Sequence, residues 1–225
     1  MSAGHSVAFL VDVDDTLLDN DGIRDDLQEH LGSTYGAESG ERYWTIQERR
    51  FVELGYRDYL GAAQEWWEEE GSEPRLLELS RYLLDYAFAD RLYPDALQVL
   101  THLRRAAPTV VVTDGDAVYQ PWKVHRAGIR EAVAGDVLVY VHKELELDDL
   151  ERRYPAERYV LVDDKLRILT AAKEFWGERV TTVLPRQGQF ANDPAITAAH
   201  PPADVTIDRV GELLDTDPEA AFGGA

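Results

Sequence analysis

Short apolar runs alternate with amphipathic stretches over much of the chain. Five runs of strand length are rich in Val and Leu, and they cover residues 7–13, 109–113, 137–141, 159–162 and 180–184. A near-continuous apolar run, without alternating polar positions, is typical of a parallel strand that is covered on both faces. Helical spacing of apolar residues precedes the second run and follows the fourth. Strands that alternate with helices predict an α/β fold with a parallel sheet.

One long stretch breaks this alternation. Residues 19–92 contain no convincing strand, but they carry amphipathic helical patterns around residues 23–31, 43–67 and 76–88. Such a stretch is too long for a crossover connection and too helical for a loop. We therefore predict a Rossmann-like, doubly wound parallel sheet core with an inserted α-helical cap domain. The core would comprise residues 1–18 and 93–225 and the cap residues 19–92, with a fraying tail from residue 215.

Composition narrows the range of functions. The 225 residues include 43 acidic and 23 basic side chains, for a formal net charge of −20. Because nucleic acids and anionic membranes recruit Lys and Arg, neither is expected as a partner. The absence of Cys excludes a thiol nucleophile, a Cys-ligated zinc site and an iron–sulfur cluster. With no apolar stretch of roughly 20 residues and no basic signal region, we expect a cytoplasmic monomer or homodimer.

Polar residues follow four of the predicted strands at the point where each strand ends. In chain order they are Asp12 and Asp14, then Thr113 and Asp114, then Lys143, and finally Asp163 and Asp164. The ligand site of an open parallel sheet lies beyond the carboxyl ends of its strands, so these side chains are expected to converge. Each alone has an ordinary explanation, such as helix capping by the acids. Together they predict a catalytic site.

The first two groups match known motifs. Asp12, Asp14 and Thr16 form the pattern Asp-x-Asp-x-Thr, and Thr113 ends a hydrophobic strand. With the groups that follow, the ordered set resembles the motifs of the haloacid dehalogenase-like hydrolase superfamily, in its phosphatase branch with an inserted helical cap of the C1 type. The match runs from about residue 7 to residue 214, and the cap aligns only by position and helicity.

The third and fourth motifs complete the resemblance with one departure. Lys143 matches the lone lysine of the third motif, and Asp163 and Asp164 match the acidic pair of the fourth. Many relatives carry proline after the third-motif lysine, where this chain has Glu144. Lys123 is a competitor, but it lies in the helix after the second strand, where relatives often carry a lysine that is not catalytic. We favour Lys143 because it follows a strand end directly.

The resemblance implies phosphate ester hydrolysis. Asp12 would attack phosphorus to form an aspartyl-phosphate, a role that carboxylates can fill. Asp14 would protonate the leaving alcohol and then activate water. The phosphoryl group of the substrate would be bound by Thr113, Asp114 and Lys143, in a reaction where positioning and electrostatics do most of the catalysis.

A cation is expected among the acids. Four carboxylates that face one another repel and raise their own pKa values unless a cation lies between them. Mg²⁺ is the natural candidate because it takes oxygen ligands and keeps substrate phosphate in its shell. The resemblance implies as ligands a carboxylate oxygen of Asp12, the backbone carbonyl of Asp14, Asp164, and Asp163 either directly or through water.

Several alternatives differ from this interpretation. Dehalogenases of the superfamily lack the second aspartate of the first motif, and phosphonoacetaldehyde hydrolases use a cap lysine, whereas residues 19–92 contain none. A sugar phosphomutase shares the whole catalytic set and stays open. Outside enzymes, the alternatives are a receiver-like signalling module and a phosphate-ligand binding protein. We expect a Mg²⁺-dependent phosphatase of a small phosphorylated molecule.

The cap is expected to select that molecule. Its aromatic residues Tyr43, Trp44, Trp66 and Trp67 could line a pocket, but at helical spacing they are more typical of a bundle core. Eight arginines in residues 19–92 could hold a second anionic group.

Overall fold

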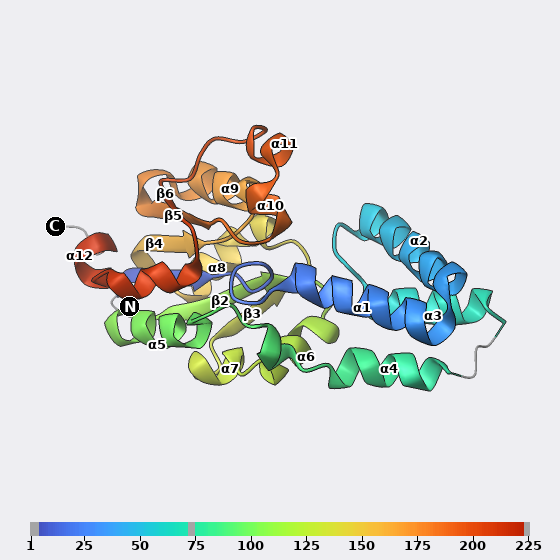
Figure 1. Cartoon of the computed structure of the whole chain (residues 1–225). Coiled ribbons are helices and arrows are strands. Elements are labelled where there is room, and N and C mark those ends of the chain that lie inside the picture. The colour runs from blue at the N-terminus through green and yellow to red at the C-terminus, as the bar shows by residue number, and fades with distance from the viewer. Residues whose placement is uncertain (1–4, 72–74, 223–225) are drawn as a thin grey trace.

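The computed structural model describes residues 5–71 and 75–222. Its sheet has six parallel strands in the order β3-β2-β1-β4-β5-β6 (Figure 1). The strands are β1 (His5–Val11), β2 (Thr109–Asp114), β3 (Val137–Tyr140), β4 (Ala156–Val162), β5 (Val180–Pro185) and β6 (Val205–Ile207). The order reverses at β1, which pairs with β2 on one side and β4 on the other. The predicted Rossmann-like, doubly wound α/β fold is confirmed.

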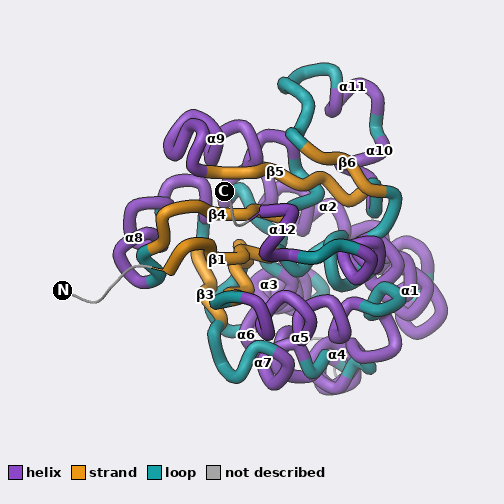
Figure 2. The backbone as a smooth tube through the Cα atoms, turned by 90° about the vertical axis from the view of Figure 1, so that its left-hand side faces the viewer, coloured by secondary structure: helices purple, strands orange, loops and turns teal. Residues whose placement is uncertain are grey.

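Helices cover both faces of the sheet because successive side chains of a strand point in opposite directions. Phe9 of β1 belongs to one apolar core and Leu10 to the other. The core around Phe9 includes residues of α5 (Ala96–Ala106), α7 (Ile129–Ala132) and a 3₁₀-helix, η4 (Val210–Asp215). The core around Leu10 includes residues of α8 (Leu147–Arg153) and α9 (Leu166–Trp176) (Figure 2).

Every helix or strand described between β1 and β2 is a helix. We call residues 20–91 the helical insertion; it consists of α1 (Asn20–Tyr35), α2 (Ala37–Leu54), α3 (Tyr59–Glu69), α4 (Leu76–Asp85) and the 3₁₀-helix η1 (Phe88–Arg91). Its helices α2 and α3 project away from the sheet (Figure 1). The exact division into core and cap stays a prediction, and its residues 1–4, 72–74 and 223–225 lie outside the described part.

The helical pattern over residues 43–67 is two helices rather than one. Gly55 ends α2 in the left-handed conformation (φ 78°), and Asp58 begins α3 by accepting a hydrogen bond from the amide of Gly61 at 2.8 Å. The apolar spacing continues across this break, so it did not reveal the turn.

Two further differences concern the end of the chain. The short strand β6 was not predicted, because its three residues are only half-buried or exposed and form no apolar run. The tail does not fray as expected over residues 215–222. It contains the last residue of η4 and the whole of α12 (Pro218–Phe222), and Phe222 packs edge-on against Phe9 with 6.1 Å between ring centroids.

The remaining described elements connect the strands. They are α6 (Tyr119–Arg126), α10 (Gly188–Asn192), α11 (Pro194–Thr197) and two 3₁₀-helices, η2 (Lys143–Leu145) and η3 (Gly177–Arg179). None of the helices in the described ranges is both long enough and apolar enough to cross a membrane.

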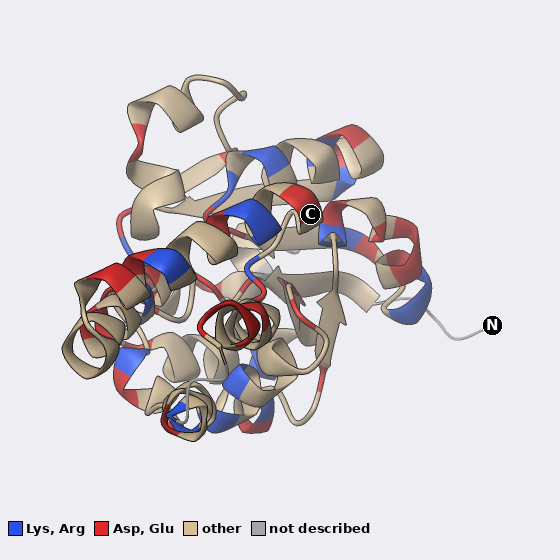
Figure 3. Ribbon diagram, turned by 90° about the vertical axis from the view of Figure 1, so that its right-hand side faces the viewer, with Lys and Arg blue, Asp and Glu red and all other residues tan. Residues whose placement is uncertain are grey.

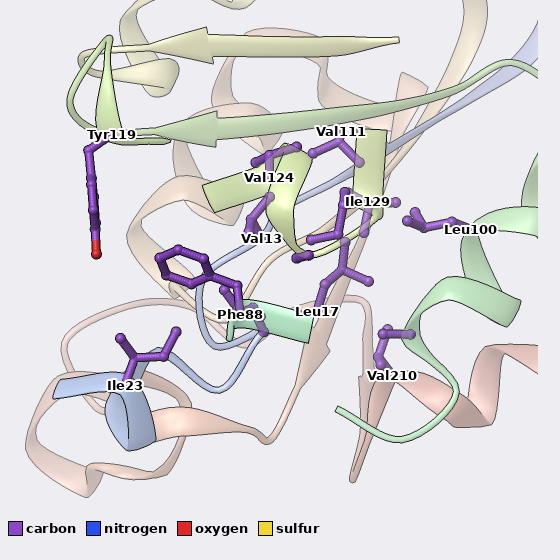
Figure 4. Close-up of a cluster of buried hydrophobic side chains, with 14 of the residues drawn as sticks. Val13, Leu17, Ile23, Phe88, Leu100, Val111, Tyr119, Val124, Ile129 and Val210 are labelled. Atoms are coloured by element: carbon purple, nitrogen blue, oxygen red, sulfur yellow. The ribbon is translucent and has the colours of Figure 1, made fainter. Parts of the chain in front are cut away.

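A continuous apolar core joins the sheet to the helical insertion. Val13 and Leu17, in the turn after β1, pack with Phe88 of η1 and Val124 of α6 (Figure 4). The cluster anchors the two ends of the insertion beside the carboxyl end of β1.

The aromatic residues of the insertion serve its own packing. Tyr43 and Trp66 are fully buried, and Trp44 and Trp67 pack partly buried against the same core. They therefore form the bundle core, as their helical spacing favoured.

Candidate active site

The predicted site residues lie together at the carboxyl end of the sheet. Asp12 follows β1, Thr113 lies near the end of β2, and Asp163 and Asp164 follow β4. All four side chains are buried. The hydroxyl of Thr16 accepts a hydrogen bond from the amide of Asp164 at 3.1 Å, which ties the turn after β1 to the turn after β4.

Lys143 links two of the acids. Its amine donates a hydrogen bond to Asp12 Oδ1 and lies 2.7 Å from Asp163 Oδ2. Burial opposes the charge on this amine, but the carboxylates of Asp12, Asp163 and Asp114 together raise the pKa of Lys143. A lysine that stays protonated here holds Asp12 in place and supplies positive charge beside it.

Three buried carboxylates could hold a cation. One oxygen from each of Asp12, Asp163 and Asp164 lies within 4.8 Å of the others. Asp12 Oδ2 and both carboxylate oxygens of Asp164 have no hydrogen-bond partner among the described residues. Burial raises the pKa of Asp12 to about 7, against the pull of Lys143, and raises that of Asp164 well above its usual value. These three carboxylates could therefore hold a cation that takes oxygen ligands.

Asp14 has different surroundings from Asp12. Its side chain is 20% exposed and lines a cavity of about 120 Å³. Oδ1 accepts a hydrogen bond from Lys123 at 2.5 Å, and Oδ2 accepts one from Gln120 at 3.2 Å. The side chain therefore faces the cavity rather than the group of three acids, and the proposed use of its backbone carbonyl as a ligand stays a prediction.

Both lysines considered from the sequence lie in the site. Lys143 contacts Asp12, as its position after β3 suggested, whereas Lys123 reaches Asp14 from α6. The sequence favoured Lys143 over Lys123 as the third-motif lysine, because Lys123 lies well past the end of β2. Its long side chain spans that distance and is 2% exposed.

Three cationic side chains surround Asp114. This carboxylate lies 3.6 Å from Lys165, 3.7 Å from Arg167 and 4.0 Å from Lys143. Burial works against its ionisation, but these three positive charges hold the pKa of Asp114 well below its usual range. Asp114 is therefore a fixed anion that holds three cationic side chains beside the cavity.

Sequence reasoning missed three residues of the site. Gln120 donates a hydrogen bond to the Thr113 hydroxyl at 2.7 Å, while Lys165 and Arg167 line the cavity. Lys165 had a signal, since it directly follows the acidic pair. Nothing in the sequence singled out Gln120 or Arg167.

The cavity lies between the sheet and the helical insertion. The sheet side and the turn after β1 contribute Asp14, Asp15, Asp114, Gly115, Gln120, Lys123, Lys165, Arg167, Gln189 and Phe190. The insertion contributes Asn20, Arg24, Phe51, Gly55, Tyr56, Arg57 and Tyr59. A molecule held against Asp14 would therefore touch both parts of the protein.

Comparisons with known proteins agree with this geometry. The family model described as haloacid dehalogenase-like hydrolase matches residues 7–175. The crystal structure of a haloacid dehalogenase-like hydrolase from Burkholderia xenovorans LB400 is 52% identical, with a TM-score of 0.90 over 96% of this chain and 98% of that chain. No curated protein matches the chain.

Two more distant structures share the fold. The L-2-haloacid dehalogenase from Xanthobacter autotrophicus, with chloropropionic acid covalently bound, is 17% identical over 92% of this chain and 96% of that chain, with a TM-score of 0.59. The HAD-hydrolase YfnB from Bacillus subtilis, bound to magnesium, is 17% identical over 95% of this chain and 98% of that chain, with a TM-score of 0.61.

Proposed function

The chain belongs to the haloacid dehalogenase-like hydrolase family, and on this premise we propose that it is a Mg²⁺-dependent phosphatase of small phosphomonoesters. Two neighbouring carboxylates in different surroundings carry the proposal. Asp12 is buried against Lys143, whereas Asp14 faces the cavity beside Lys123. Two carboxyl groups whose environments differ in this way can take separate roles as nucleophile and as acid and base.

Asp12 is the nucleophile of the proposed reaction. One of its carboxylate oxygens attacks phosphorus, and the bond between phosphorus and the alcohol oxygen of the substrate breaks. Lys143 holds Asp12 in position and offsets the negative charge that accumulates on the phosphoryl oxygens. The product of this step is an aspartyl-phosphate and the free alcohol.

Asp14 moves the proton in both steps. It donates a proton to the departing alcohol oxygen, and it then accepts one from the water that attacks phosphorus. The second attack breaks the bond between Asp12 and phosphorus, which releases phosphate and restores both carboxyl groups. A halide leaving group needs no proton, so a carboxylate at this place favours phosphate esters over haloacids.

The three buried acids fit a resident cation. Asp12 and Asp164 would hold Mg²⁺ through the oxygens that lack hydrogen-bond partners among the described residues, with Asp163 beside them. When bound, the ion would relieve the repulsion among these carboxylates and offset charge on the phosphoryl oxygens. Thr113, with its hydroxyl held by Gln120, and the backbone at Asp114 would bind the remaining phosphoryl oxygens.

A substrate screen tests the proposal. Phosphate release is measured from sugar, nucleotide and carboxylic acid phosphates, with Mg²⁺ and with chelator, beside Asp12→Asn. We expect Mg²⁺-dependent turnover of small phosphomonoesters that Asp12→Asn reduces at least 1,000-fold. Turnover of 2-chloropropionate in place of any phosphate ester, or undiminished turnover in Asp12→Asn, would contradict it. Interconversion of hexose phosphates without phosphate release would instead identify a mutase.

A further inference from the structure

The side of the cavity formed by the helical insertion carries an unpaired polar group. Tyr59, the first residue of α3, is 4% exposed and lines the cavity. Its hydroxyl has no hydrogen-bond partner among the described residues. The backbone carbonyl of the same residue is used, since it accepts a hydrogen bond from the Tyr43 hydroxyl at 3.1 Å. A buried hydroxyl without a hydrogen-bond partner destabilises the protein, so a ligand that forms a hydrogen bond with it removes this cost and binds more tightly.

Charge in the cavity differs in sign from charge on the rest of the molecule. The chain has 43 acidic and 23 basic residues, and both kinds are spread over its helices (Figure 3). The described residues that line the cavity include five basic side chains and only three acidic ones. The five are Arg24, Arg57, Lys123, Lys165 and Arg167. A protein this acidic concentrates positive charge at one place, which favours an anionic ligand.

The basic residues on the sheet side already have carboxylate partners. Lys123 lies 2.5 Å from Asp14, and Lys165 and Arg167 both approach Asp114. Their charge serves the phosphoryl site described above. They therefore leave little to recognise a second group of the substrate.

The two arginines of the helical insertion that line the cavity, Arg24 and Arg57, are bound less tightly by other side chains. Arg24 Nε is buried and has no hydrogen-bond partner among the described residues, while its Nη1 is 3.4 Å from Asp21. Arg57 reaches Glu48 at 2.9 Å, but the side chain of Glu48 is 61% exposed and can release it into water. Asp14, Arg24, Arg57 and Tyr59 all line the same cavity.

We propose that Arg24, Arg57 and the Tyr59 hydroxyl bind a carboxylate of the substrate, so that the enzyme acts on small phosphorylated carboxylic acids. The inference rests on the proposed phosphatase function, because it names the substrate class of that site. Guanidinium groups match the two oxygens of a carboxylate, and a tyrosine hydroxyl adds a donor. Burial keeps this hydroxyl protonated by raising the pKa of Tyr59. A cavity of about 120 Å³ limits the carbon chain between the two anionic groups to a few atoms.

A matched pair of substrates tests the inference. Glycerol 3-phosphate has a hydroxymethyl group where 3-phosphoglycerate has a carboxylate. The readout is the ratio of their kcat/KM values at a fixed Mg²⁺ concentration. We expect the wild-type enzyme to prefer the carboxylate at least tenfold. Tyr59→Phe, which keeps the ring, and Arg24→Gln should each lower that ratio at least fivefold. Arg49→Gln is the control, since Arg49 is an exposed arginine of α2 outside the cavity, and it should leave the ratio unchanged.

A binding measurement separates this inference from the proposed function. Asp12→Asn protein with Mg²⁺ is titrated with both phosphates by calorimetry, alone and combined with either Tyr59→Phe or Arg24→Gln. Tighter binding of the carboxylate, reduced by Tyr59→Phe, supports the inference even if no phosphomonoester is turned over. Equal binding of the two phosphates, or a preference that neither Tyr59→Phe nor Arg24→Gln changes, overturns it, while turnover of both phosphates would leave the phosphatase assignment standing.

Discussion

The amine of Lys123 lies 2.5 Å from Asp14 Oδ1, although 109 residues separate them along the chain. Lys123 extends from α6, whose Gln120 contacts the other oxygen of the same carboxylate at 3.2 Å. Because both contacts come from one helix, α6 sets the position of the carboxylate that faces the cavity. Lys123 is thus a positioning residue for the proposed acid and base.

Replacing Lys123 tests this role. Lys123→Met keeps most of the volume but frees the Asp14 carboxylate, and misplacement by about 1 Å can cost about 100-fold in rate. We expect kcat/KM for an alkyl phosphate to fall roughly 10- to 100-fold. The loss should be smaller for p-nitrophenyl phosphate, whose leaving group needs little protonation. Equal losses for both substrates would show a general structural defect instead.

The unpartnered oxygens of Asp164 predict a trade between stability and metal binding. Asp164→Asn removes a buried charge, so the metal-free protein should gain about 1–3 kcal/mol in free energy of unfolding. The same change should weaken Mg²⁺ binding at least 100-fold. Thermal unfolding with and without Mg²⁺ measures both effects. Asp208→Asn, at an exposed acid, serves as the control, and equal stabilisation of the Asp164 variant and wild type by Mg²⁺ would refute the assignment.

Asp15 should make the metal-free protein less stable as pH rises. Its backbone is left-handed (φ 57°), and its Oδ1 accepts hydrogen bonds from the amides of Asn20 and Asp21 at 2.9 and 3.1 Å. Burial raises the pKa of Asp15 to about 7 from 3.8. The folded state therefore binds this proton more tightly, and the resulting stability is complete below about pH 4 and is lost as pH rises through about 7.

Asp15→Asn isolates this contribution, because the amide keeps an acceptor for α1 and carries no charge. The variant should gain stability relative to wild type as pH rises from 4.5 to 8, by up to about 4 kcal/mol. Urea unfolding in chelator across that range measures the difference. Asp25→Asn, at an exposed residue of α1, controls for the loss of one charge. A difference that does not vary with pH would mean that Asp15 is already ionised in the folded protein at pH 4.5.

The sequence predicted the parts of the fold that burial on both faces determines. The apolar runs at β1, β2, β4 and β5 correspond to strands because strands buried on both faces must be continuously apolar. The edge strand β6 was not predicted, because its three half-buried or exposed residues form no continuous apolar run. The packing of Phe222 against Phe9 could not be predicted, because a single aromatic residue near a chain end has no periodicity.

The residues of the site also fall into those that the sequence could place and those that it could not. Residues that directly follow strands, such as Asp12 and Asp164, could be placed because topology brings the ends of parallel strands together. Lys123 and Gln120 reach the site from a helix, and their contribution depends on which face of α6 turns inward. Arg24 was one of eight arginines in residues 19–92, and only the packing of the insertion over the sheet distinguishes it.

The turn at Gly55 predicts a link between the helical insertion and substrate affinity. Gly55 has φ 78°, and a Cβ added there would lie 2.5 Å from Cε1 of His142, which belongs to the loop after β3. Gly55→Ala should therefore force the turn at Gly55 and the His142 ring apart, on top of a backbone cost of about 1 kcal/mol. Because Gly55 and Arg57 line the cavity, we expect KM to rise about 3- to 10-fold with a smaller change in kcat.

Two further variants identify the cause of that change. Gly36→Ala is a matched control, since Gly36 also has a positive φ (90°) in the insertion but a Cβ there would meet no described atom within 4 Å. It should lower stability without raising KM. Adding His142→Ala to Gly55→Ala should restore most of the affinity, because it removes the ring that the new methyl group strikes. A KM that stays high in the double variant would show that backbone strain at Gly55, rather than contact with His142, controls the cavity.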